Sequence, residues 1–494
     1  MTDTSIFPDS TYADTVLGPL FDGVKTHFAD HMAMIDRAHL VMLKETGIIG
    51  SAESAKLAQA VQAAHSEVDL ENLTYTGEFE DYFFWIEAEL RKHLGDLGGA
   101  LHTARSRNDI DHTVFRMGLL ARSQAMMGQV LTLIQALLSK AEQESETLIV
   151  AYTHGQPAQA TTFGHYLAAM IEVLLRDAKR LSDAIDVVDR CPLGAAAITT
   201  SGFPIDRART ADLLGFDGSV QNSYGCIASV DYITGLYSAI KLMFLHLGRT
   251  VQDMAFWSSF EVGQLYVPNA LVQISSIMPQ KRNPVPIEHL RHLSSVTVGH
   301  CDTMMSTMHN TPFTDMNDSE GEVQQAGYAA FNSADRVLRL MTAFLPACSV
   351  NSANVKRNAE AACVTITELA DTLVRDEGLT FRQAHEIAAH TSRACIREQA
   401  NLGEGYVAFI SAFETATGHA PALTEEAFRE AVSMEGFVSR RDRFGGPAPA
   451  ALSAAFDTYR TDLVDLMSRS TSRAIRRKNA QHALDTAFKA LLEA

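Results

Sequence analysis

The chain has 494 residues, of which 41 are Lys or Arg and 59 are Asp or Glu, so that its formal net charge is −18. This balance argues against a diffuse basic surface that would hold a nucleic-acid backbone. With 46% hydrophobic and 20% charged residues, the composition is that of a globular protein with ample apolar material for a large core, and not that of a disordered chain.

The targeting and redox features of the sequence predict a cytoplasmic protein. Its beginning, MTDTSIFPDSTYADTV, has no Lys or Arg, and we therefore expect no secretory signal. No run approaches the ~20 apolar residues of a membrane span. The six cysteines are scattered without a C-x-x-C pair, which indicates neither a zinc cluster nor a disulfide framework.

Residues 1–104 predict an N-terminal domain of shorter helices. A much longer segment follows at residues 109–146, which contain no proline and no glycine except Gly118 and Gly128. Apolar residues recur there at spacings of three and four, which is the period of a helix. The pattern predicts a continuous helix about 55 Å long, at a rise of 1.5 Å per residue.

Four further long helices are predicted in the central region, at residues 163–188, 229–259, 285–308 and 321–342. Because each is apolar on more than one face, each must be covered on several sides. Joined by short loops, the five helices predict a central bundle domain over residues 105–354 and an oligomer in which helices of different subunits pack together. The remainder, residues 355–494, predicts a C-terminal domain of shorter helices.

Three segments rich in polar residues, Gly and Pro are predicted to interrupt or cap these helices: HTARSRND (102–109), YTHGQPAQAT (152–161) and ISSIMPQKRNP (274–284). The first places Arg107 and Asn108 immediately before a helix, where free backbone N–H groups and the helix dipole favour an anion. An ordinary polar helix cap is the alternative. In the second, His154 lies beside a glycine, and a lone histidine is more often a packed or surface residue than an acid or base.

The third segment is more specific. It brings a pair of hydroxyl groups, Ser275 and Ser276, close to the ammonium group of Lys281, and its two prolines keep it out of regular helix. A proline-rich turn between helices is the alternative. The specific spacing S-S-x-M-P-x-K-x-N-P argues against that alternative.

This spacing resembles the signature loop of the fumarase and aspartase superfamily, G-S-S-x-M-P-x-K-x-N. HTARSRND, the YTH segment and QKRNP resemble its argininosuccinate lyase branch, as do ITELADTLVRDEGLTFRQAHE (366–386) and RFGGPAPAAL (443–452). The resemblance covers essentially the whole chain. It implies an all-α homotetramer whose long helices form a twenty-helix core, with each active site assembled from three subunits.

The resemblance also implies a reaction, the elimination of fumarate from an N-substituted aspartate with release of an amine, and without a metal or organic cofactor. Removal of a proton beside a carboxylate leaves a dianion, so the site must supply positive potential and N–H donors. By resemblance Ser275 is the catalytic base, and Lys281 activates it and stabilises the intermediate. His154 matches a histidine paired with a glutamate, here Glu288, which would handle protons at the leaving nitrogen or organise water.

Further residues match family positions that hold the succinyl carboxylates of the substrate. These residues are Arg107, Asn108, Thr153, Ser276 and Asn283. The serine loop is expected to be mobile and to close over the substrate. The implied partners are a small-molecule N-substituted aspartate, fumarate and an amine, with no nucleic acid and no membrane.

The chain departs from the branch where the amine half of the substrate would bind. A substrate-contacting Ser is replaced by Asp36, and the stretch PFTDMNDSEGEV puts Asp315 at a Tyr, Glu320 at a Gln and Val323 at a Lys. A substrate α-carboxylate would be repelled there, and a missing polar partner in a buried site costs ~1–3 kcal/mol. We therefore predict that the three acids bind a different amine, a diamine or one that is otherwise cationic.

Three alternatives remain open at this point. The acids could point away from the ligand or pair with nearby bases, which would leave argininosuccinate lyase proper, acting in arginine biosynthesis. The second alternative is an aminopolycarboxylate lyase, of the type that cleaves ethylenediamine disuccinate. The third belongs to another functional class: a non-catalytic structural protein similar to the lens crystallins of this family.

Overall fold

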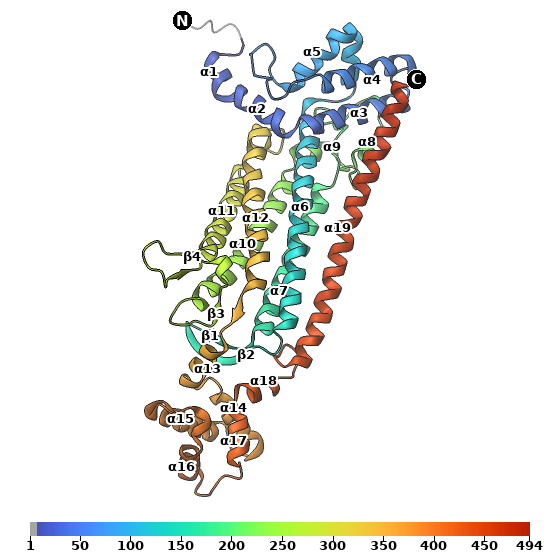
Figure 1. Ribbon diagram of the computed structural model, residues 1–494. Coiled ribbons are helices and arrows are strands. Elements are labelled where there is room, and N and C mark those ends of the chain that lie inside the picture. Colours follow the sequence, from blue (N-terminus) through green and yellow to red (C-terminus); the bar gives the residue numbers. More distant parts are fainter. Residues whose placement is uncertain (1–6) are drawn as a thin grey trace.

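The computed structural model describes residues 7–494 and forms an elongated, all-α molecule with a small lobe at one end (Figure 1). The first six residues of the segment in which no secretory signal is expected lie outside this range. Among the described residues, no helix combines the length and the apolar character needed to cross a membrane.

Five long helices build the centre of the molecule, as predicted. They are α6 (Arg107–Gln143), α7 (Phe163–Val188), α10 (Asp231–Trp257), α11 (Val285–Thr307) and α12 (Gly321–Ala347). Helix α6 packs against α7 and α12, and α11 packs between α10 and α12. Buried Leu, Ile, Val, Met and Phe residues from all five form one continuous core. Only α12 differs appreciably from its predicted range, because it continues through Pro346 in its last turn.

The connections between these helices are longer than the short loops predicted. A hairpin of β1 (Leu148–Thr153) and β2 (Gln156–Thr162) joins α6 to α7. Residues 189–230 contain the short helices α8 (Arg207–Leu214) and α9 (Ser223–Ala228). The α10–α11 connection holds β3 (Leu265–Tyr266), a 3-10 turn (Asn269–Leu271), β4 (Gln273–Ile274) and β5 (Arg282–Asn283), and the α11–α12 connection holds a 3-10 turn (Asn317–Ser319).

The N-terminal region consists of shorter helices at one end of the bundle, as predicted. It contains α1 (Ser10–Tyr12), a π-helical turn (Ala13–Leu17), α2 (Gly18–His27), α3 (Ala29–Glu45), α4 (Ser51–Ser66), α5 (Tyr82–Leu94) and a 3-10 helix (Gly95–His102). Helices α2 and α3 lie across the end of the bundle, where α2 contacts α12 and α3 contacts α6.

At the opposite end, short helices with a hydrophobic core of their own form the small lobe. After β6 (Ser349–Val350) the chain forms α13 (Ser352–Ala361), α14 (Ile366–Asp376), α15 (Phe381–Glu398), a 3-10 turn (Leu402–Glu404), α16 (Tyr406–Thr417), α17 (Glu425–Ala431) and α18 (Met434–Ser439). The strand β6 pairs with β3 and so ties this region to the bundle.

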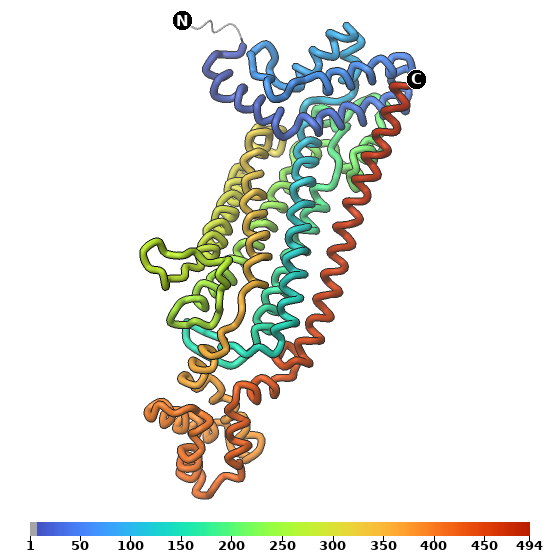
Figure 2. The backbone as a smooth tube through the Cα atoms, in the orientation of Figure 1, coloured from blue at the N-terminus to red at the C-terminus, as the bar shows by residue number. Residues whose placement is uncertain are grey.

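The last helix, α19 (Pro449–Leu492), is 44 residues long and corrects the prediction of only shorter helices after residue 354. It runs back along α7 and α6 to α4 and α3, so that the C-terminus lies beside the N-terminal helices (Figure 2). Its buried residues form a narrow stripe that includes Phe456, Leu463 and Leu484. Helix α19 packs on the bundle and not within the small lobe. The domain boundaries after residues 104 and 354 stay a prediction.

Candidate active site

The beginning of α6 is held by Asp109. Its carboxylate accepts the backbone N–H of Ser106 at 2.8 Å, which caps the helix, and those of Gly194 at 2.8 Å and Ala196 at 2.9 Å. Burial raises the pKa of Asp109 to about 6, although these donors act in the opposite direction. Asp109 therefore fixes the segment after α7 against the start of α6.

The sequence placed Arg107 and Asn108 just before a helix, but in the structure they are the first two residues of α6. The Arg107 guanidinium donates to Asp81 at 2.7 Å and to Glu80 at 3.0 Å, and it lies over the ring of Phe84 at 4.8 Å. Its side chain is still 36% exposed. The group is thus positioned at the surface, at a helix N-terminus that favours an anion.

Asp36 does not face an open site. Arg105 donates to one carboxylate oxygen at 2.6 Å, and His65 Nε2 lies 2.8 Å from the other. Burial alone would raise the pKa of Asp36, but the Arg105 cation and the His65 hydrogen bond lower it to about 2. With both oxygens engaged, Asp36 supports Arg105, which favours the alternative that this acid pairs with a nearby base.

Asp315 and Glu320 lie close to each other and to Arg107. The neighbouring His112 imidazole is the main cause that lowers the pKa of Asp315. Burial raises the pKa of Glu320, and the negative charge of Asp315 adds to this effect. The two acids that the sequence assigned to the amine half therefore lie at the same end of the bundle as Arg107.

Two residues of this region, Asp111 and His112, were missed by the sequence analysis. Burial and the neighbouring charge of Glu320 raise the pKa of Asp111. His112 is fully buried, with its Nε2 atom 3.6 Å from Asp315 Oδ1. Asp111 could have been found from the sequence, because it lies four residues after Arg107 and therefore on the same face of the predicted helix.

Thr153 and His154 lie at the tip of the β1–β2 hairpin. Thr153 pairs with Gln156, and the two residues between them, His154 and Gly155, both have positive φ, at 53° and 73°. Such a two-residue turn matches the twist of a hairpin. Thr153 and His154 are exposed.

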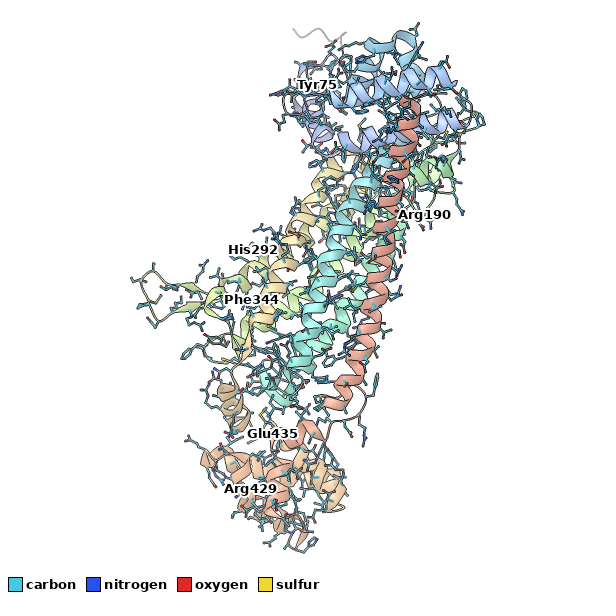
Figure 3. All side chains as sticks on the ribbon, turned by 45° about the vertical axis from the view of Figure 1, so that its right-hand side comes forward. Tyr75, Arg190, His292, Phe344, Arg429 and Glu435 are labelled. Carbon is cyan, nitrogen blue, oxygen red and sulfur yellow. The ribbon has the colours of Figure 1, made fainter. Side chains whose placement is uncertain are left out.

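Ser275 lies in a hairpin arm, residues 273–283, in which β4 pairs with β5. Its hydroxyl oxygen accepts the backbone N–H of Met278 at 3.0 Å and that of Ile277 at 3.4 Å. Ser276 and Lys281 are exposed, and Asn283 is half-buried in β5. The arm stands away from the bundle (Figure 3), and 83% of the Ile277 surface is accessible.

The structure does not bring the predicted residues together within one chain. Arg107 and His154 lie at opposite ends of α6, whose 37 residues span about 55 Å. Ser275 lies in the arm, and the exposed Glu288 is in the first turn of α11. Within residues 7–494, no cluster of three or more His, Cys, Asp or Glu side chains is placed to hold a metal ion.

Comparison with known proteins gives consistent matches over nearly the whole chain. The family described as Lyase matches residues 25–299, and the family described as Argininosuccinate lyase C-terminal matches residues 363–439. Argininosuccinate lyase 2 of Agrobacterium fabrum is 58% identical, over 93% of this chain and 92% of its own. Argininosuccinate lyase of Nitrosococcus oceani is 34% identical, over 87% and 90% of the two chains.

Among solved structures, EDDS lyase in complex with formate superposes with a TM-score of 0.86 at 26% identity. The match covers 98% of this chain and 99% of the other. The class II fumarase of Schistosoma mansoni has a TM-score of 0.64 at 15% identity, over 83% and 94% of the two chains, and so shares the fold.

The buried position of Asp36 predicts that Asp36→Asn destabilises the fold. The substitution leaves Arg105, whose side chain is 3% exposed, without its charged partner, and such a loss costs about 3–5 kcal/mol. Urea unfolding would measure it. The control is Asp22→Asn, whose acid is 61% exposed beside Lys25 and should contribute less than about 1 kcal/mol. Unchanged stability together with a raised KM would instead make Asp36 a substrate contact.

Proposed function

We propose that this chain, a member of the argininosuccinate lyase family of carbon–nitrogen lyases, releases fumarate from an N-substituted aspartate with Ser275 as the base. The observation that supports Ser275 most directly is the pair of backbone N–H groups directed at its hydroxyl oxygen. A serine hydroxyl is far too weak an acid to ionise unaided. Donors fixed on its oxygen favour the ionised form, because hydrogen bonds to a charged state stabilise that state.

The elimination begins when Ser275 takes the β proton of the aspartate half. The electron pair moves into the adjacent carboxylate as a dianion, and the bond from carbon to nitrogen then breaks to give fumarate and the free amine. The Lys281 ammonium is on the same arm and would stabilise both the alkoxide and the dianion. His154 and Glu288 would supply the proton to the leaving nitrogen.

The succinyl half is held by polar groups from separate elements. Arg107 is available because its bonds to Glu80 and Asp81 leave part of the guanidinium exposed. Asn108 follows it in the first turn of α6, and we assign Thr153, Ser276 and Asn283 to the same carboxylates. The apolar Ile277 side chain is exposed on the arm, which fits a loop that closes over the substrate and excludes water.

These groups can meet only if different subunits contribute them, since α6 separates two of them by about 55 Å. The outward faces of α10 and α11 carry exposed apolar side chains, among them Leu242, Leu245 and Val296. Apolar side chains on a long helix favour burial against another subunit. We therefore propose a homotetramer in which the long helices form the shared core.

The amine pocket is proposed to be altered relative to argininosuccinate lyase. Asp315, whose pKa is lowered, places negative charge near Arg107, and Glu320 lies beside it. Val323 offers no cation to a substrate α-carboxylate. The second candidate is argininosuccinate lyase proper, favoured by the 58% identity to a protein of that name.

Replacement of the proposed base is expected to abolish elimination. Ser275→Ala should lower kcat for fumarate release by about 10²- to 10⁴-fold, the usual contribution of a positioned base, with little change in unfolding temperature because the arm lies outside the core. Fumarate absorbance reports the rate. Ser411→Ala, at an exposed serine of α16, is the control. Full activity of Ser275→Ala would remove Ser275 from the mechanism. If the protein without any substitution released no fumarate, a crystallin-like structural role would be favoured instead.

Shared active sites predict complementation between two inactive variants. Co-expression of Ser275→Ala with Arg107→Gln should restore activity, because roughly a quarter of the sites in mixed tetramers draw each residue from the unaltered subunit. The control is the same two variants purified separately and mixed without subunit exchange. If mixed tetramers form and remain inactive, Ser275 and Arg107 act from the same chain.

A further inference from the structure

A cavity of about 370 Å³ lies where the last turns of α19 meet α3 and α4. Figure 1 shows these three helices together beside the C-terminus. The volume falls within the usual range of small-molecule pockets, about 300–1,000 Å³. None of the residues that line the cavity is assigned to the substrate above, so a ligand here would be a second one.

Part of the lining is apolar. Ala33 of α3 and Val61 of α4 contribute to it, together with Phe488 and Leu492 of α19. These side chains come from all three helices. A short aliphatic chain in the cavity would therefore lose contact with water on several sides, which is favourable.

The Arg37 guanidinium lines the same cavity and has unused donors. Its Nη2 atom donates to Asp485 at 2.5 Å, and its Cζ atom lies 4.8 Å from the centre of the Phe488 ring. Within residues 7–494 the guanidinium makes no other hydrogen bond, so Nη1 keeps its donors. Because a guanidinium fits the two oxygens of a carboxylate, Arg37 can bind an anion while it stays paired with Asp485.

Asp36 determines which nitrogen of His65 carries a proton. Although burial opposes it, Arg105 and the hydrogen bond of His65 lower the pKa of Asp36 to about 2. The carboxylate is thus ionised and can only accept, so His65 Nε2, 2.8 Å away, is the donor. The other ring nitrogen, Nδ1, points away from Asp36. It has no hydrogen-bond partner within the described part of the chain and is not enclosed, and His65 lines the cavity.

The charge around His65 favours an anion. The charged groups that line the cavity or lie directly behind the imidazole are Asp36 and Arg37 on α3, Arg105 before α6, and Asp485 and Lys489 on α19. Cations outnumber acids in this set even when His65 is neutral. Histidine gains its second N–H between about pH 5 and 8, and a protonated His65 would donate to Asp36 from Nε2 and to a ligand from Nδ1. A bound carboxylate would therefore bring a proton with it.

We infer that the cavity between α3, α4 and α19 binds a small aliphatic carboxylate. Arg37 and His65 bind the carboxylate group, and the aliphatic chain packs on Val61, Phe488 and Leu492. In this arrangement Asp36 orients His65, which gives the buried acid a role outside the substrate site. The inference does not depend on the proposed lyase reaction.

Two ligands of equal size test the site. Pentanoate and its uncharged amide, pentanamide, differ only in the group that Arg37 and His65 would bind, and calorimetric titration of the full-length oligomer measures the Kd of each. We expect pentanoate to bind at least about tenfold more tightly, because hydrogen bonds to an ionised acceptor are the stronger ones. Titration at pH 7 in two buffers of different ionisation enthalpy should show proton uptake. Equal binding of the two ligands, binding of neither, or tighter binding of inorganic phosphate would overturn the inference.

Variants connect the binding to the named residues. Gln62→Glu keeps the size of an exposed side chain that lines the cavity, removes no contact and adds a negative charge. It should weaken pentanoate binding at least about tenfold through repulsion, and Arg37→Gln should do the same. Arg209→Gln, at an arginine of α8 that pairs with Glu45 away from the cavity, is the matched control and should leave the Kd unchanged. Thermal unfolding verifies that each variant is folded. Unchanged affinity in both cavity variants would contradict the assignment.

The substrate site also contains cations, so a further variant locates the ligand. Arg107→Gln removes a cation at the beginning of α6 and should leave the Kd for pentanoate unchanged. If pentanoate binding is lost in Arg107→Gln and kept in Arg37→Gln, the carboxylate binds at the substrate site and the inference is wrong. Fumarate release is not measured in any of these titrations, so the proposed function can fail while the cavity still binds pentanoate.

Discussion

The length of α6 determines how this protein can work. Its 37 residues carry Arg107 at one end and lead into the hairpin of His154 at the other, about 55 Å away. Because the helix is packed against α7, α12 and α19, it cannot bend enough to bring the two ends together. A site that uses both must be formed between chains, which supports the proposed homotetramer.

Within that arrangement, local charge matters more than the net charge of −18. A dicarboxylate approaching such a chain is repelled at long range, so in the proposed site the succinyl half depends on Arg107, Lys281 and a helix N-terminus. The amine half is proposed to lie near Asp315 and Glu320 instead. Asp36, which the sequence placed with them, is already satisfied by Arg105 and His65. Of the three acids, Asp315 and Glu320 therefore remain candidates for contact with the amine half.

The sequence predicted the bundle well because its signals are local. Residues 163–188 were predicted as a helix and are α7 at the same bounds, since they lack proline and show strong apolar periodicity. Helix α19 was missed because its buried stripe is narrow, although it too lacks glycine and contains no proline after Pro449. Partners distant in sequence were not predictable in this way. Asp36 and Arg105 are 69 residues apart. His112 of α6 comes near Asp315, in the α11–α12 connection, only because α12 packs against α6.

We propose that the succinyl half of the site is retained while the amine half is altered. Steady-state elimination from argininosuccinate, followed by fumarate absorbance, distinguishes this site from that of argininosuccinate lyase proper. We expect a kcat/KM well below about 10⁴ M⁻¹s⁻¹, because the α-carboxylate of the arginine half would meet Asp315 and Glu320 without a compensating lysine. A value near or above about 10⁴ M⁻¹s⁻¹, the range of an ordinary good enzyme, would show that the amine half is unaltered and would favour argininosuccinate lyase proper.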